Sequence, residues 1–126
     1  MFEQDYIMRQ IQQIIQILMK IIFKIDTASP ETFLIKEIGK REQADDMLRN
    51  IDSGNIAEAE QMLFTTIKNR TLDDLLVALV FYSHLNEKDD DFFETNNYSR
   101  SYVENSIKRL LSEYGLEHLA YLFFYD

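Results

Sequence analysis

Residues 72–85, LDDLLVALVFYSHL, contain an unbroken run of apolar side chains from Leu75 to Tyr82. A helix that is apolar on every side is normally a buried helix. Thr71 precedes this stretch and Asp74 follows three residues later, a spacing that is typical of the start of a helix. We therefore expect a buried helix that begins at Thr71 and forms the centre of the fold.

The N-terminal stretch predicts a long amphipathic helix over residues 3–25. Apolar side chains recur there at alternating spacings of four and three, the signature of one helix face. This face consists of Ile7, Ile11, Ile14, Leu18, Ile21 and Ile25. The apolar arc spans roughly 140° in the first half, and Ile17, Met19 and Phe23 widen it to roughly 240° in the second. The polar strip that remains is formed by Arg9, Gln13, Gln16, Lys20 and Lys24.

Between these two helices, the sequence predicts a second helix that is interrupted. Ser29 and Pro30 are expected to begin it as the N-cap and the first helical residue. Gly39 and the polar run 40–43 are expected to break it. An apolar face then continues until residues 52–55, DSGN, end the helix.

The remaining turn signals predict three further helices. Asn55 is expected to cap the next helix, and Glu58 to complete a capping box. The inner face of this helix is expected to consist of Ile56, Ala59, Leu63 and Ile67. Residues 86–97 are polar and acidic and are expected to form a solvated loop. Ser99 is expected to cap a helix that Gly115 ends. The inner residues of this helix are expected to be Val103, Ile107, Leu110, Leu111 and Tyr114. A last short helix follows in residues 116–126. The pattern predicts an all-α protein, a compact bundle of five to seven helices in a single domain, 1–126.

Composition excludes several classes of protein. Apolar residues make up 46% of the chain and charged residues 28%, which is ordinary for one globular domain. There is no cysteine, so disulfides and thiolate-bound zinc are excluded. The net charge of −9 and the lack of a strongly basic segment make nucleic acid a poor partner. In the N-terminal stretch, no more than three apolar residues run together, so we expect no transmembrane segment. Its acidic, glutamine-rich beginning is unlike a signal peptide, so we expect a cytoplasmic protein.

No recognisable set of catalytic residues is present. The three glycines belong to no phosphate-binding loop. His84 and His118 stand far apart in the sequence, without the spacing of a metal-binding pair. The segment that holds Asp89 and Glu94 lacks the alternating ligands and the glycine of a calcium loop. We predict no catalytic residue, no metal ligand and no cofactor, and the sequence favours a protein without enzymatic activity.

One stretch resembles part of a tetratricopeptide repeat. In residues 53–67, SGNIAEAEQMLFTTI, Gly54 and Asn55 occupy the corner between two helices, and Ala59 stands where the helices of that motif touch. The preceding helix fits less well, because Asn50 stands where the motif has an aromatic residue. The match does not recur about 34 residues later, as a repeat array requires. The resemblance implies a helix-turn-helix in the middle of the bundle.

A second resemblance covers nearly the whole chain. It rests on MFEQDYIMRQI at residues 1–11, GNIAEAEQMLF at residues 54–64 and YGLEHLAYLFF at residues 114–124. These segments are similar to a family of small, acidic, all-helical proteins from Gram-positive bacteria, a domain of unknown function. The resemblance implies an all-α fold and a bacterial, cytoplasmic source. It implies no activity and no catalytic residue.

The excess apolar surface of the N-terminal helix favours a protein-interaction module. A helix on a single core usually shows an apolar stripe little more than 100° wide. We therefore expect a homodimer, or a partner helix from another protein, to cover the remainder. The candidate self-association surface consists of Ile7, Ile11, Ile14, Ile17, Leu18, Met19, Ile21 and Phe23.

Two other hypotheses remain open at this point. The tyrosines concentrate in the last third of the chain, where they could line a pocket of a small-molecule-binding protein or an enzyme. The N-terminal helix could instead lie in a membrane interface, although its polar face carries more glutamine than such helices usually have. The ordinary role of tyrosines, packing at the edge of a core, competes with the first hypothesis.

Overall fold

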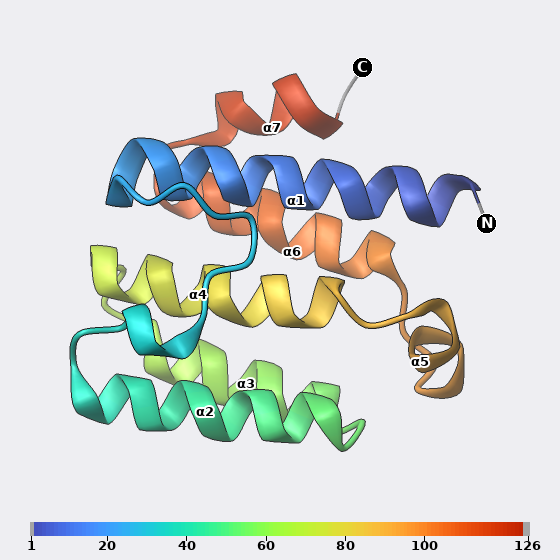
Figure 1. Ribbon diagram of the computed structural model, residues 1–126, viewed down its shortest axis with the longest axis horizontal. Helices are drawn as coiled ribbons and strands as arrows, with labels where there is room; N and C mark the ends of the chain where they lie inside the picture. The colour runs from blue at the N-terminus through green and yellow to red at the C-terminus, as the bar shows by residue number, and fades with distance from the viewer. Residues whose placement is uncertain (1, 125–126) are drawn as a thin grey trace. The chain divides into compact units, whose positions relative to one another are not determined.

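The computed structural model describes residues 2–124. Within that range the chain is all-α, without a strand, as the sequence predicts (Figure 1). The elements are α1 (Phe2–Phe23), a 3₁₀ turn η1 (Thr32–Leu34), α2 (Ile38–Asp52), α3 (Ile56–Thr66), α4 (Leu72–Asn86), α5 (Asp90–Thr95), α6 (Arg100–Glu113) and α7 (Glu117–Phe124).

The chain forms two compact units, which are described separately below. The terminal unit comprises Met1–Ser29 and Asn86–Asp126, and the middle unit comprises Pro30–Leu85. Helix α4 therefore belongs to the middle unit except for its last residue, Asn86. A single domain over 1–126 stays a prediction.

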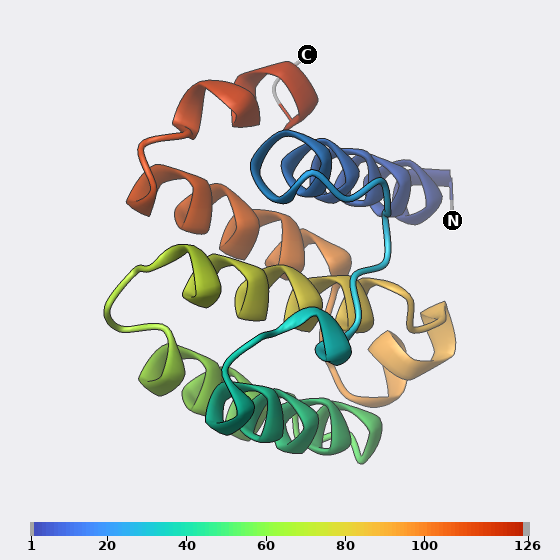
Figure 2. The same cartoon turned by 60° about the vertical axis from the view of Figure 1, so that its left-hand side comes forward.

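In the middle unit, α2 and α3 form an antiparallel hairpin, and η1 packs against α2 (Figure 2). The side chains that the sequence places on the inner face of α3, from Ile56 to Ile67, are buried. On α4, every side chain from Leu75 to Tyr82 is buried, which confirms that this apolar run lies in the core. Burial of these side chains is the dominant favourable contribution to folding.

In the terminal unit, α1 packs against α6 and α7, and α6 packs against α7. The predicted inner residues of α6 from Val103 to Leu111 are buried, whereas Tyr114, which was also predicted to lie inside, is half-buried. Ser99 is the N-cap residue of α6, as predicted, but its side chain makes no capping hydrogen bond.

Three helices end with the same backbone motif. In each, one residue has a positive φ, and the residue after it donates a hydrogen bond to a carbonyl five positions back. The positive-φ residues are Gly54 after α2, Asn97 after α5 and Gly115 after α6. After α1, Lys24 also has a positive φ, but there the backbone N–H of Ile25 donates to the carbonyl oxygen of Met19, six positions back. The predictions that DSGN ends one helix and that Gly115 ends another are thus confirmed. Lys24 fills a position that normally favours glycine.

The predicted boundaries between residues 29 and 43 are wrong. Ser29 and Pro30 lie before η1, and α2 begins only at Ile38, so Gly39 and residues 40–43 form its first turns instead of breaking it. The reason is tertiary: Ile35 is fully buried in extended backbone, and its carbonyl oxygen accepts a hydrogen bond from Nε of Arg41 at 2.9 Å.

Two other local predictions also need correction. Asn55 is the N-cap residue of α3, but its side chain makes no capping hydrogen bond, so the capping box with Glu58 does not form. The acidic segment 86–97 contains the short helix α5 where a loop was expected. Its N-cap residue, Asp89, accepts a hydrogen bond from the backbone N–H of Phe92 at 2.8 Å, and Phe93 is buried.

Candidate functional site

The candidate self-association surface divides into a buried and an accessible part. Ile11, Ile14, Leu18 and Met19 are buried, with at most 1% of each residue exposed. The accessible residues are Ile7, Ile17 and Phe23, which are half-buried, and Ile21, which is 60% exposed. A second molecule could therefore touch only the second group.

The buried residues of α1 explain this division. At 100° per residue, the fully buried positions from Ile14 to Met19 span an arc of about 140°. Met19 falls at the edge of this arc, next to Ile15 one helical turn earlier, and so belongs to the core. The apolar residues outside this arc are Ile17 and Ile21, which lie beyond its Ile14 edge, and Phe23, which lies beyond its Met19 edge.

Two adjacent hollows run along the exposed side of α1 in the terminal unit. The first, of about 380 Å³, is lined by Tyr6, Arg9, Gln10, Gln13, Leu122 and Phe123. The second, of about 290 Å³, is lined by Gln13, Gln16, Ile17, Lys20, Asp26 and Phe123. They share Gln13 and Phe123, so they form one open groove beside the end of α7. We call the residues of α1 that line it, Tyr6, Arg9, Gln10, Gln13, Gln16, Ile17 and Lys20, the α1 strip.

Two glutamines of the α1 strip form hydrogen bonds at the borders of the groove. Nε2 of Gln10 donates a hydrogen bond to the carbonyl oxygen of Phe123 on α7. Nε2 of Gln16 donates to Oδ1 of Asp26 at 3.0 Å, just beyond the end of α1. A primary amide carries two N–H donors and an acceptor oxygen, so each glutamine retains the capacity for further hydrogen bonds.

The sequence predicted the polar strip of α1 but did not predict that it lines a groove. Arg9, Gln13, Gln16 and Lys20 were predicted to be polar remainders of the helix, and all four line the groove. The role of Gln10 was missed because it depends on α7. No pattern within residues 1–25 predicts that the last helix lies beside the first.

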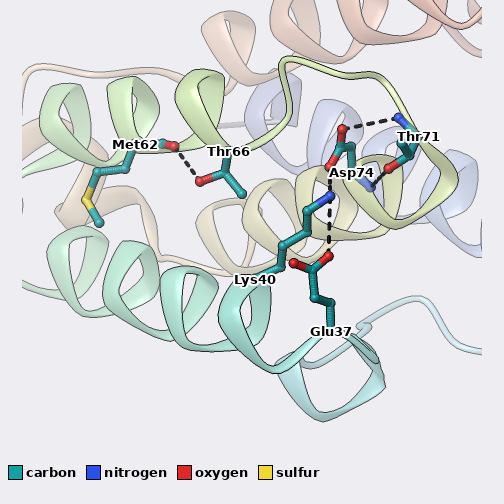
Figure 3. A network of polar contacts seen from close by, with 6 residues as sticks. All are labelled: Glu37, Lys40, Met62, Thr66, Thr71 and Asp74. Atoms are coloured by element: carbon teal, nitrogen blue, oxygen red, sulfur yellow. Dashed lines mark hydrogen bonds and ion pairs between the residues drawn. The ribbon is translucent and has the colours of Figure 1, made fainter.

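The middle unit contains a buried ion pair between α2 and α4 (Figure 3). Nζ of Lys40 donates to Oδ1 of Asp74, which is fully buried, and Oε2 of Glu37 lies 3.8 Å from the same amine. The backbone N–H of Thr71 donates to Oδ2 of Asp74 at 3.2 Å, and the backbone N–H of Asp74 donates to Oγ1 of Thr71 at 3.1 Å. This reciprocal pair is a capping box at the start of α4.

These contacts shift the pKa of both partners. Burial alone would raise the pKa of the Asp74 carboxyl, but the hydrogen bonds from Lys40 and Thr71 outweigh it and lower the pKa below its usual value. The hydrogen bond to Asp74 raises the pKa of the Lys40 amine despite its partial burial. The pair is therefore fully charged at neutral pH, and it joins two helices instead of holding a reactive proton.

The terminal unit buries a second polar cluster, at the start of α6. Nη1 of Arg100 lies 2.5 Å from Oδ1 of Asp90, Nη2 donates to the carbonyl oxygen of Lys88, and the guanidinium carbon lies 4.6 Å from the ring centroid of Phe93. Only 2% of Arg100 is exposed. Nδ2 of the neighbouring buried residue, Asn86, donates to the carbonyl oxygen of Met8 at 3.0 Å.

This cluster is incompletely satisfied. Among residues 2–124, neither Nε of Arg100 nor Oδ1 of Asn86 has a hydrogen-bond partner, although both atoms are buried. Sequence reasoning missed the cluster. The available signal was an arginine in the first turn of a helix, where the helix dipole disfavours a cation.

The two histidines have separate environments. Nε2 of His84 lies 2.7 Å from Oδ1 of Asp52 in the middle unit, whereas His118 is exposed on α7 in the terminal unit. Within the part of the chain that the structure describes, no three His, Cys, Asp or Glu residues are grouped so that they could hold a metal ion.

The aromatic residues of the last third of the chain vary in burial. Phe93 is buried and stacks on Tyr98, with ring centroids 6.3 Å apart, so these aromatics anchor the segment around α5 to the core. Tyr102 and Tyr121 are 56% and 66% exposed. Tyr125 lies outside the described residues. No tyrosine of this region lines the α1 groove as described above.

Comparison with known proteins places the chain in a family. Residues 1–115 match a family of unknown function (DUF6483), and the chain belongs to this family. No curated protein and no solved structure matches the chain. Among the described helices, none has the length and apolar character needed to cross a membrane.

Proposed function

We propose that this protein is a non-enzymatic helical interaction module that binds a second copy of itself through the exposed side of α1. The observation that carries the proposal is Ile21, which is 60% exposed on a helix whose neighbouring face forms the core. Half-buried Ile17, one helical turn before Ile21, extends the apolar surface on the same side of α1 and lines the α1 groove. Contiguous exposed apolar patches on a protein surface can mark interaction sites.

The charge distribution supports the same location. The chain carries a net charge of −9, so most of its surface repels a second copy. The α1 strip contains two cations, Arg9 and Lys20, and no carboxylate. Contact through this strip therefore avoids most of the acidic surface, although Asp26 borders the groove.

The α2–α3 hairpin forms a further part of the proposal, as a tetratricopeptide-like helix-turn-helix. Ala59 is fully buried on α3, where that motif needs a small residue, and Gly54 has a φ of 85° at the corner. In repeat proteins, stacked hairpins of this kind form extended binding surfaces. A bacterial, cytoplasmic setting rests on the sequence resemblance described above.

Sedimentation equilibrium on the purified protein tests the proposal. We expect a dimer at micromolar concentration, and we expect Ile21→Glu to weaken it about tenfold or more, because the substitution places a charge where apolar surface is buried. Ile38→Glu provides a matched control, since Ile38 is 66% exposed but lies on α2. A protein that is monomeric at every concentration would contradict self-association.

The same protein can be tested against the two other hypotheses. Co-sedimentation with anionic vesicles would favour a membrane-interface role for α1 over a dimer. A small molecule that raises the melting temperature, with the effect lost in Tyr102→Ala or Tyr121→Ala, would favour a binding pocket among the tyrosines.

A further inference from the structure

The α1 strip has the same spacing in both directions from Gln13. Tyr6, Gln10, Gln13, Gln16 and Lys20 follow one another at intervals of four, three, three and four residues. These five residues lie on one side of α1, because all of them line the groove. Two such helices that pack side by side in opposite directions, with Gln13 at the centre, place each residue opposite its counterpart at the same distance from Gln13.

This arrangement brings complementary groups together. Gln13 meets Gln13 of the second copy, and two primary amides can each donate to and accept from the other. Gln10 lies opposite Gln16 in the same way. Tyr6 lies opposite Lys20, which allows a contact between an ammonium group and an aromatic ring.

The exposed charges near the ends of α1 favour the antiparallel direction. Asp5 and Lys20 are both exposed, and within the described residues neither side chain forms an ion pair. In an antiparallel pair, Asp5 of each copy lies near Lys20 of the other. In a parallel pair, Lys20 would lie near Lys20 and Asp5 near Asp5, and both contacts would be repulsive.

Apolar residues flank the row of polar side chains that runs from Tyr6 to Lys20. Ile17 belongs to the α1 strip, and Leu122 of α7, which is 68% exposed, lines the same hollow as Tyr6. A helix of this length is about 33 Å long, which is sufficient for a continuous interface with exposed residues of α7 at its border.

We propose that two copies of this chain pair through antiparallel α1 helices, with a two-fold axis beside Gln13 and with Asp5 of each copy next to Lys20 of the other. This inference rests on the proposed function, and it adds the direction and the register of the pairing. A two-fold arrangement closes the assembly at two copies.

Single cysteines test the register directly, because the natural chain has none. Under mild oxidation, we expect Gln13→Cys to form a disulfide-linked dimer, since a residue on the two-fold axis faces itself. We expect Tyr6→Cys and Lys20→Cys to remain unlinked when each is oxidised alone, and to link to each other when the two variants are mixed. Glu42→Cys, an exposed position on α2, controls for links formed by random collision.

Charge exchange provides an independent test. We expect Asp5→Lys and Lys20→Asp each to raise the dimer dissociation constant about tenfold, since each creates two repulsive contacts, and the double variant to restore it. Circular dichroism identifies any variant that fails to fold.

The outcomes separate the two proposals. If sedimentation shows only monomers and no cysteine variant links above the Glu42→Cys level, both the proposed function and the pairing are overturned. If sedimentation shows a dimer but Tyr6→Cys and Lys20→Cys each link to themselves, or Gln13→Cys does not link, the pairing is overturned and self-association stands.

Discussion

The two units of this protein each bury a polar cluster, but only one of them satisfies its buried atoms. In the middle unit, both carboxylate oxygens of Asp74 accept a hydrogen bond, one from Lys40 and one from Thr71. In the terminal unit, Asn86 and Arg100 each keep one buried atom without a partner among the described residues. A buried polar atom that lacks a partner loses its hydration without compensation. We infer that the first cluster stabilises its unit, whereas the second stabilises less than its number of contacts suggests.

The largest effect on stability is expected when the cluster around Asp74 loses its cation, Lys40. Lys40→Met should lower the free energy of unfolding by about 3 kcal/mol, because it leaves the fully buried Asp74 carboxylate without its counter-charge. Urea denaturation measures this change. In the double variant Lys40→Met with Asp74→Asn, part of the loss should return, because no buried charge remains. If the double variant loses as much unfolding free energy as Lys40→Met and Asp74→Asn lose in sum, the two side chains are not coupled.

The second prediction concerns the pH dependence of the same cluster. The pKa of Asp74 is lowered in the folded protein, so its contribution is present above the pKa of the unfolded carboxyl, about 3.9, and is lost as the pH falls through the lower folded value. The difference in unfolding free energy between the natural protein and Asp74→Asn should therefore be constant near neutral pH and should narrow below about pH 4. Urea titrations at several pH values check this. A difference that widens in acid would contradict the direction of the shift.

The third prediction tests the unsatisfied cluster. Asn86→Leu should cost only about 1 kcal/mol or less, because it removes one hydrogen bond to the carbonyl oxygen of Met8 but also removes an acceptor that has no partner. Thermal unfolding against the natural protein measures the change. A loss as large as that of Lys40→Met would show that the two clusters contribute equally.

The smallest effects are expected at two helix ends where a residue has a positive φ. Lys24 has a φ of 60° after α1 in the terminal unit, and Gly54 has a φ of 85° after α2 in the middle unit. Lys24→Gly should stabilise the protein by about 0.5 kcal/mol, since glycine adopts this conformation without steric cost. Gly54→Ala should destabilise it by about 1 kcal/mol for the same reason. Changes of equal sign in the two melting temperatures would contradict this explanation.

The sequence predicted the cores of the helices better than their boundaries. The run from Leu75 to Tyr82 and the inner face of α3 were identified because burial imposes a periodicity that a single segment displays. The start of α2 was misplaced because Ser29 and Pro30 form a favourable local signal for a helix start. The buried position of Ile35 and the contact of Lys40 with Asp74 decide the actual boundary.

The candidate site was predicted in part for a similar reason. The apolar arc of α1 correctly separated a core face from a polar strip, but Met19 was assigned to the wrong side of that division. The groove depends on α7, and Gln10 reaches the backbone of Phe123 more than a hundred positions later. No local pattern contains such a contact.

By itself, the sequence determined that this chain is all-α, which residues can line a core, and where glycines end helices, because these properties follow from the period of the helix and the backbone of single residues. Only the tertiary structure decided how much of α1 stays exposed, which buried polar atoms find partners, and where α2 begins. Each of those outcomes depends on atoms that are distant in the sequence and are brought together by packing.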